Sequence, residues 1–437
     1  MEKSQAVFSL VLSVLFLFTT FNGGGLMVNA VGAEDGSADG SEAWGYVEVR
    51  PKAHMFWWYY SSPYRTQDSR KPWPIILWLQ GGPSLSGAGI GNFEEIGPLD
   101  VHLKPRNSTW LRIADLLFVD NPVGTGFSYV EDPKLLVKTD YEAACDLTTL
   151  LTEFFNKKTN LQKNPLYIVS ESYGGKIAVI LGLSALRAIQ VGKLKLNLGG
   201  IALGASWISP EDSVLSWGPL LKDVTRLDNN GLVKSNRIAN EIKHQIKYGK
   251  FVEATGSYIK LQGVISNNSN GVDFFNFMLD LWMDDLVASS AGGSDLDTLM
   301  NGEIKKNLKI IPKNVKWTGR QYDVFKAFGG DFMKPRILEV DLLLAKGVDI
   351  TIYSGQLDVV CSTMGTEAWV SKLKWDGLKT FLGMERTPIY GEGDKVTKGF
   401  TKSFRNLHLY QILKAGHFVP ADQPLIALNM IASITRN

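Results

Sequence analysis

Short apolar runs, rich in β-branched and aromatic residues, alternate with helical patterns through most of this chain. The runs are AHMFWWYY (53–60), PIILWLQ (74–80), DLLFVD (115–120), PLYIVS (165–170), GGIALGAS (199–206), VDITIYSG (348–355) and LHLYQIL (407–413). A helical pattern, KIAVILGLSALRAIQ (176–190), comes directly after the fourth run. Strands that are apolar on both faces and alternate with helices are typical of a mainly parallel sheet covered by helices on both sides. The sequence therefore predicts an α/β fold.

The pattern changes between residues 208 and 338. This stretch is charged and amphipathic, as in LVKSNRIANEIKHQIKYGKFVEA (232–254), and it has no strong strand run. We expect a mostly helical insertion there, a candidate lid, within a core made of residues 44–207 and 339–437. The length of 437 residues is compatible with one large α/β domain that carries such an insertion.

The first thirty residues have the features of a secretory signal peptide. Lys3 precedes the apolar run AVFSLVLSVLFLFTTF (6–21), and small residues lead to a cleavage site near Ala30. A signal anchor is the alternative. Residues 31–43 are acidic and rich in Gly and Ser, and we expect a flexible mature N-terminus. Secretory entry makes Asn107 and Asn267, each in an N-x-S/T sequon, candidate glycosylation sites. Secretion and a vacuolar or lysosomal destination both remain open.

Composition excludes several function classes. The net charge of +2 gives no strong field for nucleic acid or for an acidic membrane surface, and no later segment has the length of a membrane helix. The five histidines are scattered without the spacing of zinc ligands, so neither a metal nor another cofactor is expected. Nothing pairs Cys145 with Cys361, and we expect both thiols to be free and mostly buried.

A serine lies at a turn between a predicted strand and a predicted helix. Ser172 follows the run PLYIVS and comes just before the helix that begins near Lys176. Its surroundings, SESYG (170–174), approach the G-x-S-x-G pattern of a nucleophile turn, with Ser170 in place of the first glycine. Such a turn exposes the serine side chain at the edge of the sheet.

Two further residues follow predicted strands and could activate that serine. Asp358 comes after VDITIYSG, and His417 comes after LHLYQIL. A serine hydroxyl needs a base and a group that orients the base, and the order Ser, Asp, His is that of α/β-hydrolases. The backbone N–H groups of Gly82, after the run PIILWLQ, and of Tyr173 are candidate oxyanion donors.

Six motifs, in this order, resemble those of the serine carboxypeptidases. They are WLQGGP (78–83), GNFEEIGPLD (91–100), DNPVGTGFSYV (120–130), SESYGGK (170–176), GQLDVVC (355–361) and AGHFVPADQP (415–424). The resemblance covers nearly all of the chain after the leader. It implies an α/β-hydrolase fold with a helical lid and release of single residues from peptide or protein C-termini, best at acidic pH. It makes Ser172 the nucleophile, His417 the base and Asp358 the group that orients the imidazole.

The resemblance also implies how the free carboxylate of a substrate is held. The matching positions are Gln80, Gly81, Glu94 and Glu171. Two close carboxyls cannot readily both ionise, so one stays protonated and can donate a hydrogen bond to the substrate. Loss of that proton as the pH rises would weaken peptide binding.

Departures from the family pattern leave other functions open. Ser84 stands where a glycine usually follows the proline, and we expect it to disturb the backbone near Gly82. Ala205 stands where the relatives carry an acidic residue or asparagine, with no clear physical effect. One alternative is an acyltransferase that uses the same triad with an activated ester. The other is a binding protein with impaired catalysis. The sequence leaves the oligomeric state open.

Overall fold

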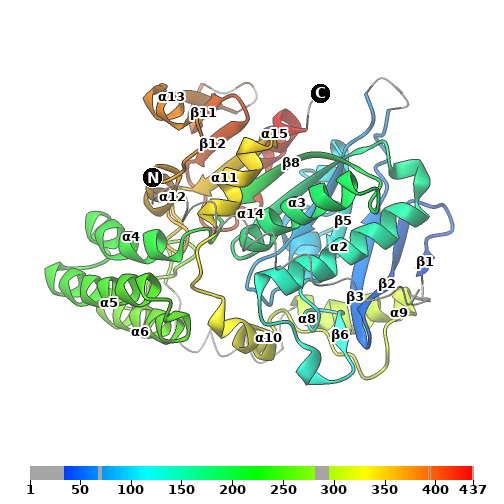
Figure 1. Cartoon of the computed structure of the whole chain (residues 1–437), viewed down its shortest axis with the longest axis horizontal. Helices are drawn as coiled ribbons and strands as arrows, with labels where there is room; N and C mark the ends of the chain where they lie inside the picture. Colours follow the sequence, from blue (N-terminus) through cyan, green and yellow to red (C-terminus); the bar gives the residue numbers. More distant parts are fainter. Residues whose placement is uncertain (1–33, 67–70, 281–294, 392, 394, 436–437) are drawn as a thin grey trace, which may run out of the picture. The chain divides into compact units, whose positions relative to one another are not determined.

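The computed structural model describes residues 34–66, 71–280, 295–391, 393 and 395–435 (Figure 1). The predicted signal peptide, residues 1–30, lies outside the described residues. Among the described residues, no helix combines the length and the apolar character needed to cross a bilayer.

The strands form one sheet. They are β1 (Glu34–Gly36), β2 (Glu42–Arg50), β3 (Ala53–Tyr60), β4 (Ile75–Leu79), β5 (Asp115–Val119), β6 (Tyr129–Val130), β7 (Pro165–Glu171), β8 (Asn197–Gly204), β9 (Ile350–Gly355), β10 (Thr387–Tyr390), β11 (Thr397–Phe404) and β12 (Leu407–Ile412). The spatial order is β1-β2-β3-β5-β4-β7-β8-β9-β12-β11-β10, and β6 pairs with β3.

The centre of the sheet is parallel and its flanks are antiparallel. The strands from β5 through β4, β7, β8 and β9 to β12 are all parallel to their neighbours. The pairs at either side of this centre are antiparallel. All seven predicted strand runs are strands, and the predicted parallel arrangement holds for the centre of a mixed sheet.

Helices cover both faces of the sheet (Figure 1). They are α2 (Asp140–Lys157), α3 (Gly174–Gln190), α4 (Pro210–Asp223), α5 (Asn229–Lys247), α6 (Phe251–Ser269), α8 (Asp295–Leu299), α9 (Lys305–Leu308), α10 (Tyr322–Ala327), α11 (Ile337–Ala345), α12 (Thr363–Val370), α13 (Leu378–Gly383), α14 (Val419–Asp422) and α15 (Pro424–Ile434). Shorter or wider turns are η1 (Gly87–Ile96, a π-helix), η2 (Trp110–Arg112), η3 (Pro133–Leu135), η4 (Thr159–Leu161), η5 (Met300–Ile304) and η6 (Phe328–Gly330).

The alternation of side chains along β3 separates two hydrophobic cores. Trp57 belongs to a core shared with α2, α3 and α11, whereas its neighbour Trp58 belongs to a core shared with η1 and α15. Successive residues of a strand point to opposite faces, so each core lies on its own side of the sheet. Burial on both faces explains why the central strands read as continuous apolar runs.

The segment between β8 and β9 is helical, as predicted. It contains α4, α5, α6, α8, α9, α10 and α11, and no strand occurs among its described residues. Its helices α4 to α6 lie together at one end of the molecule (Figure 1). Asp228 caps the start of α5, where its carboxylate accepts from the N–H of Gly231 at 2.7 Å, and Asn270 caps the end of α6 in the left-handed conformation.

The expectation of a flexible segment at 31–43 is wrong for its described residues 34–43. β1 pairs antiparallel with β2, Glu34 opposite Gly45 and Gly36 opposite Ala43. The turn between them is closed by Ser37 and Asp39: the N–H of Glu42 donates to Ser37 Oγ at 2.9 Å and that of Ser41 to Asp39 Oδ1 at 3.0 Å. The acidic and Gly-rich composition therefore builds a hairpin rather than a free tail.

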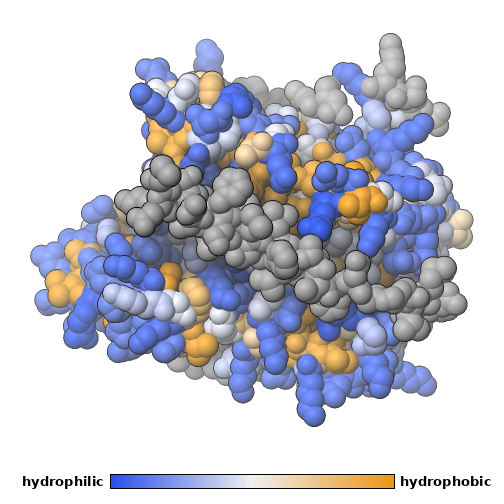
Figure 2. Space-filling view, in the orientation of Figure 1, coloured by the Kyte–Doolittle hydropathy of each residue, from blue (hydrophilic) through white to orange (hydrophobic). Residues whose placement is uncertain are grey.

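The described surface on the face drawn in Figure 2 is mostly polar. Figure 2 shows hydrophilic residues over much of the described surface, with smaller hydrophobic patches between them. Asn107 and Asn267, the two sequon asparagines, are both exposed.

Candidate active site

Three loops at the carboxyl edge of the parallel strands carry the predicted triad. Ser172 follows β7, Asp358 follows β9 and His417 follows β12. β8 separates β7 from β9, and β12 is the other neighbour of β9. The strand order thus explains why residues far apart in the sequence come together.

Ser172 lies in a strained turn between β7 and α3. Its φ is 56°, a left-handed conformation that is rare for non-glycine residues. The turn is fixed by hydrogen bonds from Ser172 N to Gly204 O and from Trp207 N to Ser172 O, each 2.9 Å long. A Cβ on Gly174 would lie 2.3 Å from Leu79 O, so only glycine allows α3 to start this close to β4.

Ser170 replaces the first glycine of the nucleophile-turn pattern without conflict. It is fully buried on β7, and its hydroxyl donates to Ala202 O on β8 at 3.0 Å. The buried hydroxyl therefore has a partner, and the departure from the pattern is absorbed inside the sheet.

His417 and Asp358 form a buried pair. His417 Nδ1 lies 2.8 Å from Asp358 Oδ2, and both side chains are at most 2% exposed. Asp358 Oδ1 accepts from Cys361 N at 3.1 Å, and His417 N donates to Phe275 O at 2.8 Å. With the Nδ1 proton directed to Asp358, Nε2 is the ring nitrogen left to accept a proton.

Cys361 completes a group that could in principle hold a metal ion. Ligand atoms of Asp358, Cys361 and His417 lie within 4.8 Å of one another. Burial and the nearby Asp358 raise the pKa of the Cys361 thiol well above its usual range, whereas a thiol binds metal as the thiolate. The donor set thus suits a hydrogen-bonded pair better than a metal centre. Cys361 and Cys145 are both free, but Cys145 is exposed, contrary to expectation.

The Gly81–Gly82 turn lies against the candidate nucleophile. A Cβ on Gly81 would be 2.5 Å from Ser172 Cβ. Gly82 has φ 113°, and a Cβ there would be 2.0 Å from Ser84 N. The positive φ is therefore adopted by Gly82, and Ser84 does not have a positive φ. The expected disturbance from Ser84 is absent, although its buried hydroxyl has no partner among the described residues.

Ala205, the other departure from the family pattern, has a positive φ just after the end of β8. Its φ is 38°, and its N–H donates to Tyr353 O at 2.8 Å. The structure gives no account of why an alanine stands there.

A carboxyl pair lies next to the turn, and one member differs from the prediction. Gln80 Nε2 lies 2.9 Å from both Glu95 Oε1 and Glu171 Oε1. Gln80 Oε1 accepts from Trp78 Nε1 at 2.5 Å, which fixes the orientation of the amide. Glu95 is 2% exposed, whereas the predicted residue Glu94 is exposed. The path of η1 turns Glu95 inward and Glu94 outward, and the repeated Glu in the sequence gave no signal to separate them.

Glu95 and Glu171 share one environment that favours protonation. Burial raises the pKa of both carboxyls, and the negative charge of Glu95 raises the pKa of Glu171 further. The two carboxyls are close enough to affect each other's protonation, and the Oε2 atom of each has no hydrogen-bond partner among the described residues. A proton held by Glu171 and donated to Glu95 satisfies both groups.

Sequence reasoning missed Tyr353, which extends this pair. Its buried hydroxyl has no partner among the described residues, and burial together with Glu171 and Glu95 raises its pKa. Tyr353 stands within the predicted strand 348–355, so only the three-dimensional proximity reveals its place.

A pocket of about 450 Å³ opens above these groups. Such a volume suits one or two amino-acid side chains. Nine of its 22 lining residues are Phe, Tyr or Trp, and more than half of the lining residues come from the insertion. The lining residues are Gly82, Leu85, Glu171, Ser172, Tyr173, Trp207, Tyr258, Ile259, Gln262, Gly263, Ser266, Val272, Asp273, Phe274, Phe275, Arg320, Tyr322, Phe325, Phe332, Val360, His417 and Phe418.

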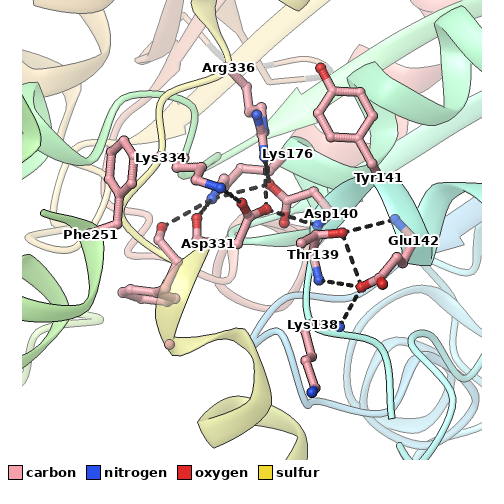
Figure 3. Close-up of polar contacts among 12 residues, drawn as sticks. Lys138, Thr139, Asp140, Tyr141, Glu142, Lys176, Phe251, Asp331, Lys334 and Arg336 are labelled. Atoms are coloured by element: carbon pink, nitrogen blue, oxygen red, sulfur yellow. Dashed lines mark hydrogen bonds and ion pairs between the residues drawn. The ribbon is translucent and has the colours of Figure 1, made fainter. Parts of the chain in front are cut away.

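A buried charge network joins the core to the end of the insertion (Figure 3). Arg336 donates to Asp140 Oδ2 and to Asp331 Oδ2, each at 2.8 Å. Lys176 Nζ lies 3.2 Å from Asp140 Oδ2 and donates to Phe332 O at 3.0 Å. The two cations and the two aspartates are buried. We call these four charged side chains, Asp140, Lys176, Asp331 and Arg336, the Arg336 network.

The Arg336 network also determines the position of one pocket wall. Tyr173 Oη donates to Asp140 Oδ1 at 2.6 Å. The Tyr173 ring stacks on Phe332, with ring centroids 5.4 Å apart and planes 7° from parallel. Both rings line the pocket, so the network fixes the residue after Ser172 and its aromatic neighbour together.

Comparison with known proteins identifies the family. The profile described as serine carboxypeptidase matches residues 33–437. The chain is 59% identical over 430 residues to serine carboxypeptidase-like 51 of Arabidopsis thaliana, covering 92% of this chain and 93% of the relative. The chain belongs to the serine carboxypeptidase family. It is 46% identical over 419 residues to the retinoid-inducible serine carboxypeptidase of Mus musculus, covering 91% and 92% of the two chains.

The fold of this family member agrees with a solved structure. The prohormone-processing carboxypeptidase of Saccharomyces cerevisiae superposes with a TM-score of 0.78 over 90% of this chain and 91% of that one, at 20% identity. The predicted α/β-hydrolase fold is confirmed, and so is the assignment of the chain to a hydrolase family.

Proposed function

We propose that this family member is an acid-favoured carboxypeptidase that releases single C-terminal residues from peptides through an acyl-enzyme. The observation that carries the proposal is the buried carboxyl pair next to Ser172. A hydrolase without need for a C-terminal carboxylate has no use for two buried acids beside its nucleophile.

Ser172 attacks the last peptide carbonyl while His417 Nε2 takes its proton. Asp358 orients the imidazole and stabilises its positive charge. The N–H groups of Gly82 and Tyr173 stabilise the oxyanion. His417 then gives its proton to the departing amine, and an ester between Ser172 and the remaining peptide is left. Water, activated by His417, hydrolyses that ester and regenerates the hydroxyl.

Gln80, Gly81 and the Glu95–Glu171 pair receive the carboxylate of the departing residue. A protonated carboxyl can donate to a carboxylate, and so can the N–H of Gly81. The amide of Gln80 donates to both carboxyls of the pair and holds them in place for the substrate. No Lys or Arg is among these four groups, so the interaction depends on the shared proton.

The shared proton gives the pH dependence its sign. Carboxyls with a raised pKa stay protonated at acidic pH and lose the proton as the pH rises through that pKa. Once both are ionised, they repel the substrate carboxylate, and KM increases. We expect kcat/KM to be higher at pH about 5 than at about 7.5. Burial raises the pKa of both carboxyls above the reference values near 4, so the proton held at the lower pH is lost as the pH rises.

The test measures KM and kcat for a blocked dipeptide at both pH values. KM of the wild type should rise with pH, whereas the double variant Glu95→Gln/Glu171→Gln should show a nearly constant KM. Glu94→Gln is the matched control because it removes the exposed carboxyl next to Glu95 in the sequence. Its KM should change with pH as in the wild type. Ser172→Ala should lower kcat by at least about 10⁴-fold.

Each outcome separates the candidate functions. A wild-type KM that stays constant up to neutral pH contradicts carboxylate recognition by the pair. Transfer of an acyl group from an activated ester to an alcohol, without release of a C-terminal residue, supports the acyltransferase. A folded protein whose Ser172 does not react with an organophosphonate is a binding protein.

A further inference from the structure

Arg320 is the basic residue of the pocket wall. Among the lining residues it is the sole Lys or Arg, and its side chain is exposed. Across the part of the chain that the structure describes, no carboxylate forms an ion pair with it. A cation in a wall rich in aromatic residues, without a carboxylate partner among the described residues, is available to a ligand.

The backbone fixes Arg320 to the loop that borders the nucleophile. Arg320 pairs with Leu85 in an isolated antiparallel bridge, and Gln321 N donates to Ser84 O at 3.2 Å. Leu85 N donates in turn to Gly81 O at 3.1 Å. Gly81 packs directly against the Ser172 side chain. Arg320 is thus positioned by the same short turn as the candidate oxyanion hole.

Arg320 lies on the side of the pocket that continues from Tyr173. The segment that carries Arg320 continues into α10, where Phe325 N donates to Gln321 O at 3.2 Å and the Phe325 ring lies 5.2 Å from that of Phe332. The positive charge of Arg320 also opposes the rise that burial gives the pKa of Tyr258. The Tyr258 ring is 5.1 Å from that of Phe332, which stacks on Tyr173. The carboxyl pair, by contrast, is reached through Glu171 and Gln80.

Asp273 also lines the pocket but does not neutralise Arg320. Asp273 Oδ1 accepts from Phe275 N at 2.8 Å. Phe275 O in turn accepts from His417 N at 2.8 Å, and burial raises the pKa of Asp273. Its carboxylate therefore belongs to the histidine side of the pocket.

We propose that Arg320 binds an acidic side chain on the penultimate residue of the substrate, and that the enzyme prefers peptides with Glu or Asp in that position. This rests on the proposed function. If the departing residue points its carboxylate to Glu95 and Glu171, the residue that becomes esterified to Ser172 extends along the Tyr173 wall, toward Arg320. A guanidinium matches a carboxylate in both charge and planar geometry.

The test compares blocked dipeptides that share one apolar C-terminal residue and differ in the penultimate residue, Glu, Gln or Lys. At pH about 5.5 a glutamate side chain is ionised and arginine is charged. The wild type should favour Glu over Gln by about five- to tenfold in kcat/KM, the range for a charged hydrogen bond that solvent partly screens. Arg320→Gln should bring that ratio to about one, and Arg320→Glu should favour Lys instead.

Lys326→Gln is the matched control. It removes an equal charge from an exposed residue of α10 that does not line the pocket, and the Glu to Gln ratio should stay as in the wild type. Added salt should lower the ratio in the wild type, since it screens an exposed pair.

The outcomes distinguish this inference from the proposed function. Cleavage of all three peptides by the wild type without a preference overturns the role of Arg320 and leaves the carboxypeptidase intact. An equal loss for all peptides in Arg320→Gln means that Arg320 binds the main-chain carboxylate, which also overturns it. No cleavage of any peptide by the folded wild type overturns both proposals.

Discussion

At the scale of single residues, the site depends on where left-handed backbone is required. Ser172 and Gly82 both adopt a positive φ, and Gly81, next to Gly82 in the sequence, packs against the Ser172 side chain. In the proposed mechanism the hydroxyl of Ser172 is required, so a non-glycine residue adopts this conformation there, whereas Gly82 adopts it without the steric cost of a side chain. The position of a glycine relative to this turn therefore matters more than the number of glycines in the motif.

This assignment gives a test with two opposite substitutions. Gly82→Ala places a Cβ 2.0 Å from Ser84 N at a φ of 113°, and it should move the N–H away from the oxyanion. We expect kcat to fall by about 10²- to 10³-fold, the usual cost of losing one oxyanion donor. Ser84→Gly should leave kcat near the wild-type value. A strong gain of activity in Ser84→Gly would contradict this assignment.

At the scale of elements, the Arg336 network holds the end of the insertion against α2 and α3 (Figure 3). Helix α2 begins at a capping box in which Thr139 and Glu142 bind each other's backbone N–H. The first residue after this cap, Asp140, is the one that meets Arg336, Lys176 and Tyr173. Burial lowers the pKa of Lys176 to about 8, which shows that the neighbouring carboxylates offset only part of the cost of burying its charge.

Loss of Arg336 from the network should lower the free energy of unfolding, and the exposed Lys334 provides the control. Arg336→Met leaves Asp140 and Asp331 buried without their shared cation, and the free energy of unfolding should fall by about 3–5 kcal/mol. Lys334 also contacts Asp331, at 2.7 Å, but is 35% exposed, so Lys334→Met should cost about 0–1 kcal/mol. Denaturant unfolding measures both. Equal losses in the two variants would show that burial of the charges does not set the cost.

At the scale of the whole molecule, the exposed sequons and the leader pattern belong to one expectation. We expect the chain to enter the secretory pathway and to carry glycans at Asn107 and Asn267. Expressed in a eukaryotic secretory host, the wild type should lose mass on endoglycosidase treatment. Asn107→Gln and Asn267→Gln should each remove one step of that loss. Mobility unchanged by the enzyme would disprove glycosylation at both sites.

The sequence predicted the parts of this molecule whose signals are local. Each central strand is a continuous apolar run, and Ser172, Asp358 and His417 each follow such a run directly, so strands and strand-end residues could be identified one at a time. The motif order then supplied the family.

The remaining parts depend on contacts between distant segments. Asp140 and Asp331 are 191 residues apart, and no sequence pattern near either residue predicts that the two are in contact. Glu95 and Glu94 are chemically identical neighbours, and only the path of η1 decides which one is buried. Tyr353 is an ordinary strand residue until the fold places Glu171 beside it.

The origin of the pocket walls separates two properties of this protein. The candidate catalytic residues come from loops at the ends of sheet strands, whereas most of the residues that line the pocket come from residues 208–338. Changes within this single stretch of sequence can therefore alter substrate preference while the residues proposed for proton transfer stay the same. Related proteins can thus evolve different substrate preferences through substitutions confined to one segment of the gene.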